Sequence, residues 1–179
     1  MASELTTRSG FTFQVRSADA GDEQALAELF THVTKDDLRF RFLSAVREVG
    51  HSQLALLTHV KDRGGENFLA LDGVGGCVLA SAMLAVDDDL EHAEVAIVIR
   101  SDSKGRGIGW SLLEYVSRRA AAMGVKVLRA VESRDNCSAI EVERDLGFTA
   151  REHPDDATLL ILEKALFTKG AELAVPVLA

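Results

Sequence analysis

The sequence predicts an α/β fold with a mixed, mostly antiparallel twisted sheet flanked by helices. Strand-like segments with alternating or continuous apolar residues follow one another through the middle of the chain, separated by short turns. Amphipathic helical patterns lie before and after them. Of the 179 residues, 47% are hydrophobic and only two are proline. The chain is therefore expected to bury one core as a single domain.

The first third of the chain predicts one strand and three helices. Residues 1–10 are expected to form an N-terminal tail. Alternation over residues 11–16 favours a strand, and the apolar residues between 26 and 33 lie on one face of a helix. A second helix is expected to start near Asp36, with its apolar stripe continuing to Val46, and a third helix covers residues 52–60.

Three consecutive strands are predicted next. Residues 67–71 and 76–86 form a hairpin closed by an Asp-Gly pair at 72–73, which is a strong turn signal. Residues 91–100 pair with the second of these strands across the acidic run 87–91. We interpret this run as a solvated turn, and the alternative is a rim that attracts a basic substrate.

A glycine-rich run follows the third strand and opens an amphipathic helix that ends near Gly124. Its sequence is Lys104-Gly105-Arg106-Gly107-Ile108-Gly109. Glycines let several backbone N–H groups converge on one point, and the positive end of the helix dipole adds to the attraction for anions. The expected ligand is a phosphate or pyrophosphate. The spacing matches neither the Rossmann nor the Walker pattern.

The last third predicts a strand, a helix and a pair of strands. Residues 125–131 read as a buried strand, and a helix over residues 135–146 ends at Gly147, since glycine tolerates the left-handed conformation. Residues 148–152 and 158–165 are expected to form two antiparallel strands.

Two motifs together resemble the GNAT family of N-acetyltransferases. Lys104-x-x-Gly107-x-Gly109 is similar to the loop with which that family cradles the pyrophosphate of acetyl-CoA. The segment 136–148, Asn-x-x-Ala-Ile-x5-Leu-Gly-Phe, is similar to a helix and strand found downstream. The resemblance implies a single-domain GNAT (acyl-CoA N-acyltransferase) fold over residues 11–167, with acetyl-CoA as cosubstrate. For the C-terminal tail 168–179, disorder, an added edge strand and a dimer contact stay open.

Within that family, the chain resembles the acetyltransferase domain of bacterial Pat-type protein lysine acetyltransferases. Residues 37–42, 54–58 and 93–105 carry this likeness. It implies direct transfer of an acetyl group to a protein lysine, typically on an acyl-CoA synthetase. Two alternatives stay open: an acetyltransferase for a small-molecule amine (polyamine, amino acid or antibiotic), and a CoA-binding sensor without transferase activity.

The same resemblance implies a general base and an acceptor groove. In Pat-type domains a glutamate at the place of Glu94 deprotonates the acceptor amine. Partial shielding from water raises the pKa of a carboxylate and makes it a better base. The alternative is that Glu94 merely faces solvent on an alternating strand. Phe40 and Phe42 are candidates to shape the acceptor groove, or else they belong to the core.

The resemblance also implies an acetyl-CoA site on the strand, the loop and the second motif. Strand backbone is expected to pair with the pantetheine arm and to supply an oxyanion donor. Loop amides are expected to hold the pyrophosphate, and Lys104 and Arg106 to add charge at the pyrophosphate or 3′-phosphate sites. Asn136 either helps to hold the pantetheine region or caps the helix. The full set is Ile97, Val98, Ile99, Lys104, Gly105, Arg106, Gly107, Ile108, Gly109 and Asn136.

One position departs from the family pattern. Where many GNAT enzymes have a tyrosine that protonates the departing thiolate, this sequence has Glu143. Tyr115, the only tyrosine of the chain, follows the loop on the next helix and is expected to be structural. Thiolate protonation is therefore left to water or to Glu143.

Composition argues against several kinds of partner. With 28 acidic and 20 basic residues, the net charge of −8 disfavours nucleic acid and favours cationic substrates. Two cysteines suggest no disulfide framework, and five histidines show no zinc spacing, so no metal is expected. No apolar run suits a membrane helix and no signal-peptide pattern is present. A cytoplasmic protein without a membrane partner is expected, with a homodimer left open.

Overall fold

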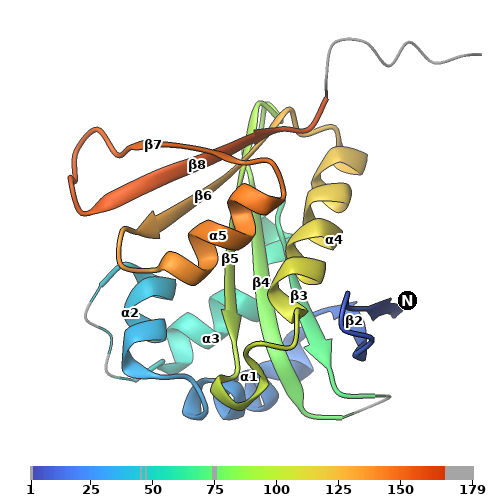
Figure 1. Ribbon diagram of the computed structural model, residues 1–179. Coiled ribbons are helices and arrows are strands. Elements are labelled where there is room, and N and C mark those ends of the chain that lie inside the picture. Colours follow the sequence, from blue (N-terminus) through green and yellow to red (C-terminus); the bar gives the residue numbers. More distant parts are fainter. Residues whose placement is uncertain (1, 45, 47, 74–75, 168–179) are drawn as a thin grey trace, which may run out of the picture.

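The computed structural model describes residues 2–44, 46, 48–73 and 76–167 (Figure 1). Its strands are β1 (Ser3–Thr6), β2 (Thr12–Ser17), β3 (Glu66–Leu71), β4 (Val78–Val86), β5 (His92–Ile99), β6 (Val127–Ser133), β7 (Thr149–Glu152) and β8 (Leu159–Ala165). Its α-helices are α1 (Glu23–Thr31), α2 (Lys35–Phe42), α3 (His51–Thr58), α4 (Ile108–Met123) and α5 (Cys137–Asp145). Short 3-10 helices are η1 (Ala20–Asp22), η2 (Val60–Arg63) and η3 (Ser101–Ser103). In these ranges no helix is long and apolar enough to cross a membrane.

The strands form one sheet in the order β1-β2-β3-β4-β5-β6-β8-β7. Each neighbouring pair is antiparallel except β5 and β6, which run parallel. A parallel pair needs a crossover connection, and α4 supplies it. The predicted mixed, mostly antiparallel sheet flanked by helices is confirmed.

Helices cover both faces of the sheet, and each face has its own apolar core. On one face α4 and α5 pack over a cluster that includes Phe13, Leu112 and Leu128. Figure 1 shows these two helices in front of the strands. On the other face α1, α2 and α3 pack over a cluster that includes Leu26 and Leu69. The sheet is thereby fixed between two layers of helices.

Strands β5 and β6 pair only where they begin. The three paired positions run from His92 with Val127 to Glu94 with Arg129. Beyond Glu94, β5 continues beside β4, whereas β6 continues beside β8. Figure 1 shows β6, β8 and β7 turning away from β4 and β5. The sheet therefore opens from Glu94 onward.

The structure differs from the sequence prediction at the N-terminus. Part of the segment predicted as a tail is strand β1, which pairs antiparallel with β2 from Ser3 opposite Val15 to Thr6 opposite Thr12. The tail predicted over residues 1–10 is therefore wrong. Every second residue of β1 is exposed, so the segment lacks the apolar run that marks a strand in the sequence.

The second predicted helix also ends earlier than expected. Its apolar stripe was expected to continue to Val46, but α2 stops at Phe42, and Leu43 adopts a left-handed conformation with φ of +50°. The side chain of Leu43 is exposed. The predicted C-terminal tail, residues 168–179, lies outside the described residues.

We expect Leu112→Ala to lower the free energy of unfolding by about 2–5 kcal/mol, because it leaves a cavity in a fully buried position of α4. Urea denaturation followed by circular dichroism measures this change. The control is Leu56→Ala, since Leu56 is exposed on α3 and its truncation should cost less than about 0.5 kcal/mol. Equal losses in the two variants would contradict the assignment of this core.

Candidate functional site

A cleft of about 460 Å³ lies where β5 and β6 diverge. This volume suits a small-molecule ligand. Strand β5, the loop after it and the start of α4 form one wall, β6 and α5 form the other, and α2 closes one side. Glu94 lines the cleft, as do nine of the ten predicted acetyl-CoA-binding residues: Ile97, Val98, Ile99, Lys104, Gly105, Gly107, Ile108, Gly109 and Asn136.

The tenth predicted residue, Arg106, lies outside the cleft lining. Its guanidinium stacks over the ring of Phe11, with 3.6 Å between its Cζ atom and the ring centroid. The Arg106 carbonyl also accepts a hydrogen bond from the Ser9 hydroxyl. This side chain therefore joins the loop to the N-terminal hairpin, and its expected contribution of charge to a phosphate site stays a prediction.

Strand β5 presents unpaired backbone groups to the cleft. The N–H of Arg100 donates to the carbonyl of Leu79 in β4, at 2.8 Å. Since backbone groups alternate in direction along a strand, the N–H and C=O groups of Ile99, Ile97 and Val95 point away from β4, toward the diverging β6. The backbone of Val98 points to β4, and its side chain packs in the core beneath α1, α2 and α3. Val95, rather than Val98, therefore shares the outward backbone direction of Ile97 and Ile99.

The glycine loop takes a conformation that other residues would resist. Gly107 is the residue before α4, with φ of +83°, and a Cβ atom there would lie 3.1 Å from Cβ of Thr7. A Cβ atom on Gly109 would lie 2.9 Å from Cδ1 of Ile99. Among the described residues no side chain caps the start of α4. The first amides of the helix therefore stay available to an anion in the cleft.

The ammonium of Lys104 already has an anionic partner in the structure. Its Nζ atom lies 2.6 Å from both carboxylate oxygens of Asp37, on α2. Asp37 also lines the cleft. A phosphate that approaches Lys104 must therefore compete with this carboxylate.

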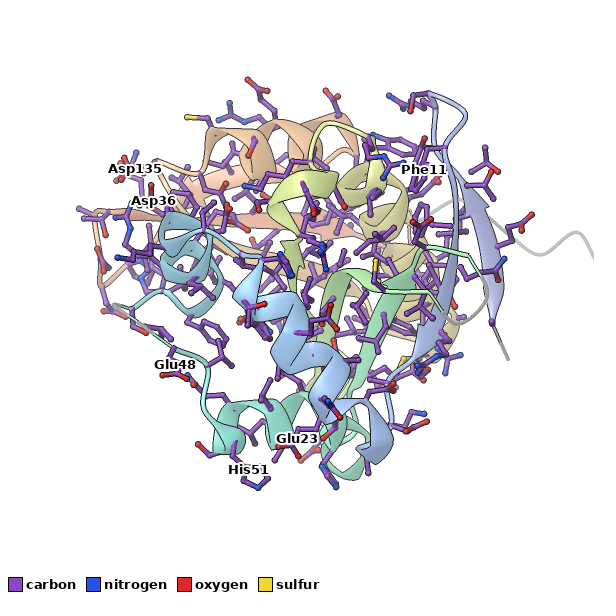
Figure 2. All side chains as sticks on the ribbon, turned by 90° about the horizontal axis from the view of Figure 1, so that it is seen from below. Phe11, Glu23, Asp36, Glu48, His51 and Asp135 are labelled. Carbon is purple, nitrogen blue, oxygen red and sulfur yellow. The ribbon has the colours of Figure 1, made fainter. Side chains whose placement is uncertain are left out.

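Helix α2 spans the open side of the cleft. Besides the contact of Asp37 with Lys104, Arg39 lies 3.5 Å from Asp135, which precedes α5. In the view of Figure 2, Asp135 and Asp36 of α2 are drawn on the same side of the molecule. Arg41 faces both Glu94 and Glu132; burial lowers its pKa to about 10, and the two carboxylates oppose that shift. The helix thus contacts both walls.

The proposed base lies at the point where the two strands separate. Glu94 is the last residue of β5 that is in register with β6. Its side chain is exposed, so the partial shielding expected from the sequence is not observed. It lies on the side of the sheet that carries α2, because Val98, two alternations along, packs in that core.

Two carboxyl groups meet on the opposite wall. Glu132 of β6 and Glu143 of α5 share a hydrogen bond, and Asn136 donates to Oε2 of Glu132 at 2.7 Å. Burial raises the pKa of Glu132 to about 7. Burial and the neighbouring charge of Glu132 raise the pKa of Glu143 to about 9. Glu143 is buried and Glu132 is half-buried. Two carboxylates so close cannot both ionise easily, so the pair shares a proton at neutral pH.

The remaining candidates separate into site and scaffold. Phe40 lines the cleft, whereas Phe42 packs against Phe30 in the core. Tyr115 packs edge-on against Phe68, as expected of a structural residue.

Although Asn136 precedes α5, its side chain makes no capping bond there, so the cap interpretation is wrong. The acidic run 87–91 precedes β5 at the end away from the cleft, and none of its described residues lines the cleft, so it forms no rim.

Comparison with known protein families identifies the family of this chain. The acetyltransferase (GNAT) family matches residues 27–148. This chain belongs to that family. The prediction made from the glycine loop and the second motif is therefore confirmed.

Individual relatives are similar over different lengths. The GNAT domain of S. lividans PAT has a TM-score of 0.83 at 22% identity, covering 92% of this chain and 96% of that one. A phosphinothricin acetyltransferase from Sinorhizobium meliloti, solved with acetyl-CoA, has a TM-score of 0.67 at 20% identity, covering 87% and 89%. At such identities these likenesses show a shared fold.

A curated sequence relative is similar over a shorter segment. The L-methionine sulfoximine/L-methionine sulfone acetyltransferase of Pseudomonas paraeruginosa is 36% identical over 55 residues. These are 31% of this chain and 32% of that protein, so the match spans about a third of the relative's length.

The carboxyl pair predicts a pH-dependent stability. The folded pKa of Glu143 lies above its ordinary value of 4.5. Its contribution is therefore most favourable below that value and is lost as the pH rises through the folded pKa. We expect the free energy of unfolding of the wild type, measured relative to Glu143→Gln, to fall by on the order of 2 kcal/mol between about pH 5 and about pH 9.

Urea denaturation across this pH range measures the difference between the two proteins. Asp145→Asn is the matched control, because Asp145 is an exposed carboxylate on the same helix. A wild-type curve parallel to that of Glu143→Gln would show that Glu143 titrates as it does in the unfolded chain.

Proposed function

We propose that this domain moves an acetyl group from acetyl-CoA directly to the side-chain amine of a protein lysine. One observation supports this most: a single cleft joins a phosphate-binding loop, a strand with unpaired backbone and an accessible glutamate. The donor supplies an activated acyl thioester. The chain supplies the groups that bind it, orient it and move protons.

The residues of the cleft fit acetyl-CoA along its length. The amides around Gly107 and the start of α4 suit the pyrophosphate, and a Cβ atom on Gly109 would narrow the cradle at Ile99. The outward backbone groups of Val95, Ile97 and Ile99 suit an extended arm with amide groups, which binds as an added strand does. A free N–H of this strand is also the proposed oxyanion donor.

Glu94 is the proposed general base. It lies at the apex of the opening, on the side of the sheet from which an acceptor can enter past α2. An ammonium group must lose a proton before its nitrogen attacks a carbonyl carbon, and a carboxylate within hydrogen-bond reach accepts that proton. Its exposure in the free protein leaves room for the acceptor.

The lining also favours a cationic acceptor with an apolar stem. Phe40 and the exposed Leu43 lie at the α2 side of the cleft. A lysine side chain combines a flexible apolar stem with a terminal ammonium, which matches this arrangement. Five carboxyl side chains and two cationic ones line the cleft: Asp37, Glu94, Glu132, Glu141 and Glu143, with Arg41 and Lys104.

A small-molecule amine is the second candidate acceptor. The segment that is 36% identical to the methionine sulfoximine acetyltransferase supports it. The likeness to Pat-type domains supports the lysine of a protein, with an acyl-CoA synthetase as the proposed target. The two candidates differ in the molecule that carries the product.

Labelled acetyl-CoA distinguishes these acceptors. We expect the purified protein, incubated with isotopically labelled acetyl-CoA and a cell extract, to place label on specific protein lysines. The Glu94→Gln variant should lower this rate by about 100-fold, because its amide cannot accept the proton. Mass spectrometry of the protein and metabolite fractions measures both outcomes.

Asp88→Asn is the control for this experiment, since it removes an exposed carboxylate of the β4–β5 turn outside the cleft. Label confined to small amines would move the assignment to the second candidate. Full activity in Glu94→Gln would show that another group is the base. No label in either fraction, despite binding of CoA, would favour a sensor role.

The ion pair between Lys104 of the loop and Asp37 of α2 predicts that substitutions of its two members change the affinity for acetyl-CoA in opposite directions. Lys104→Ala should weaken the affinity for acetyl-CoA about tenfold, since it removes a cation from the pyrophosphate site. Asp37→Asn should strengthen it several-fold, because the competing carboxylate is gone. Isothermal titration calorimetry measures both, with the exposed Lys35→Ala on the same helix as control. Weaker binding in Asp37→Asn would mean that this ion pair supports the donor site.

A further inference from the structure

The wall of the cleft formed by β6 and α5 carries a proton that the transfer described so far does not use. Glu143 is only 4% exposed, lines the cleft and has no partner for its Oε2 atom among the described residues. An isolated buried carboxylate is costly, whereas a carboxylic acid beside a carboxylate is stable. The site is therefore built to hold one proton on two carboxyl groups.

The surroundings place this proton on Glu143. Asn136 donates a hydrogen bond to Glu132, and the positive charge of Arg41, from α2, acts on the same group. Both stabilise the ionised form of Glu132. Among the residues that the structure describes, no side chain donates such a bond to Glu143, which gives its own hydrogen bond to Glu132. The pair is thus a carboxylic acid held against a carboxylate.

We propose that the Glu132–Glu143 pair is the proton donor for the sulfur that leaves during acetyl transfer, with Glu143 holding the proton. This inference rests on the proposed function. The bond between the amine nitrogen and the carbonyl carbon forms, and the carbon–sulfur bond breaks with its electron pair left on sulfur. The proton of the pair moves to sulfur and gives a free thiol. Glu94 takes the proton that the amine loses, and solvent returns one to the pair.

Geometry and acidity both support this role. The pair lies on the wall opposite β5. Since the backbone of β5 is proposed to orient the acyl group, the reacting atoms would lie between that strand and the carboxyl pair. Glu143 has a raised pKa of about 9, close to the value of about 8.5 for an ordinary thiol. A proton passes efficiently between groups of matched pKa.

The first test replaces the acid by its amide. Glu143→Gln keeps the size of the side chain but carries no transferable proton. With both substrates saturating, we expect its kcat to fall about 100-fold while the dissociation constant for CoA is unchanged. Asp145→Asn, on the exposed side of α5, should keep the wild-type rate. A Glu143→Gln variant that keeps more than about a third of the wild-type rate would overturn the inference.

The second test changes the pKa of Glu143 while keeping its carboxyl group in place. Glu132→Gln removes the negative charge that raises the pKa of Glu143. We expect the alkaline limb of its rate profile to shift to lower pH, an effect that a merely structural role would not produce. The groups to consider in this profile are Glu94, Arg41 and the pair itself. An unchanged alkaline limb would overturn the assignment of the proton to Glu143.

A third readout needs neither substrate nor turnover. The infrared spectrum of the wild type at neutral pH should contain the carbonyl band of a protonated carboxylic acid, and this band should be missing in Glu143→Gln. Its absence from the wild type would overturn the inference even if acetyl transfer occurs. A wild type that shows the band but transfers no acetyl group would overturn the proposed function, and the donor role with it.

Discussion

The divergence of β5 from β6 is the constraint on which the rest of the site depends. Two parallel strands that stayed paired would use their backbone groups on each other and would leave no room between them. Here the ladder stops at Glu94, and the outward groups of Val95, Ile97 and Ile99 are left for a ligand. Pairing with β4 on one side and β8 on the other keeps both strands rigid although they separate. The cleft is therefore preformed by the sheet.

The charged groups of this cleft are arranged to match the two proposed substrates, acetyl-CoA and an amine. The loop and the start of α4 present amides and one lysine at the end that suits the phosphates. Carboxyl groups gather where the acyl group and the amine are expected to meet. Helix α2 lies across both regions, with Asp37 against the cationic part and Arg41 facing the acidic part. In the free protein the helix thus offers each region a side chain of opposite charge.

The sequence allowed the fold and one wall of the site to be predicted, because their signals are local. Turn residues, apolar alternation and the glycine loop report the strands, the hairpins and the phosphate cradle within a few residues of each other. The contacts that complete the cleft are not local. Asp37 and Lys104 are 67 residues apart, and no sequence motif that contains one of them predicts a contact with the other. Glu143 was noticed only as a departure from the family pattern, and its partner Glu132 gave no signal on a strand of mixed burial. Strand β1 was missed because a short edge strand with exposed residues carries little apolar pattern.

The short ladder between β5 and β6 also affects how the protein opens. Along this seam only three registered positions join the sub-sheet of β6, β8 and β7 to the rest. Within each part the ladders are longer, as between β4 and β5 or β6 and β8. The apolar cluster under α4 and α5 is continuous across the seam, since it includes Val95 of β5 and Leu128 of β6. Side-chain packing, more than backbone pairing, therefore holds the two sub-sheets together. A ligand that contacts both walls adds further contacts between the two sub-sheets, so its binding free energy stabilises them against separation.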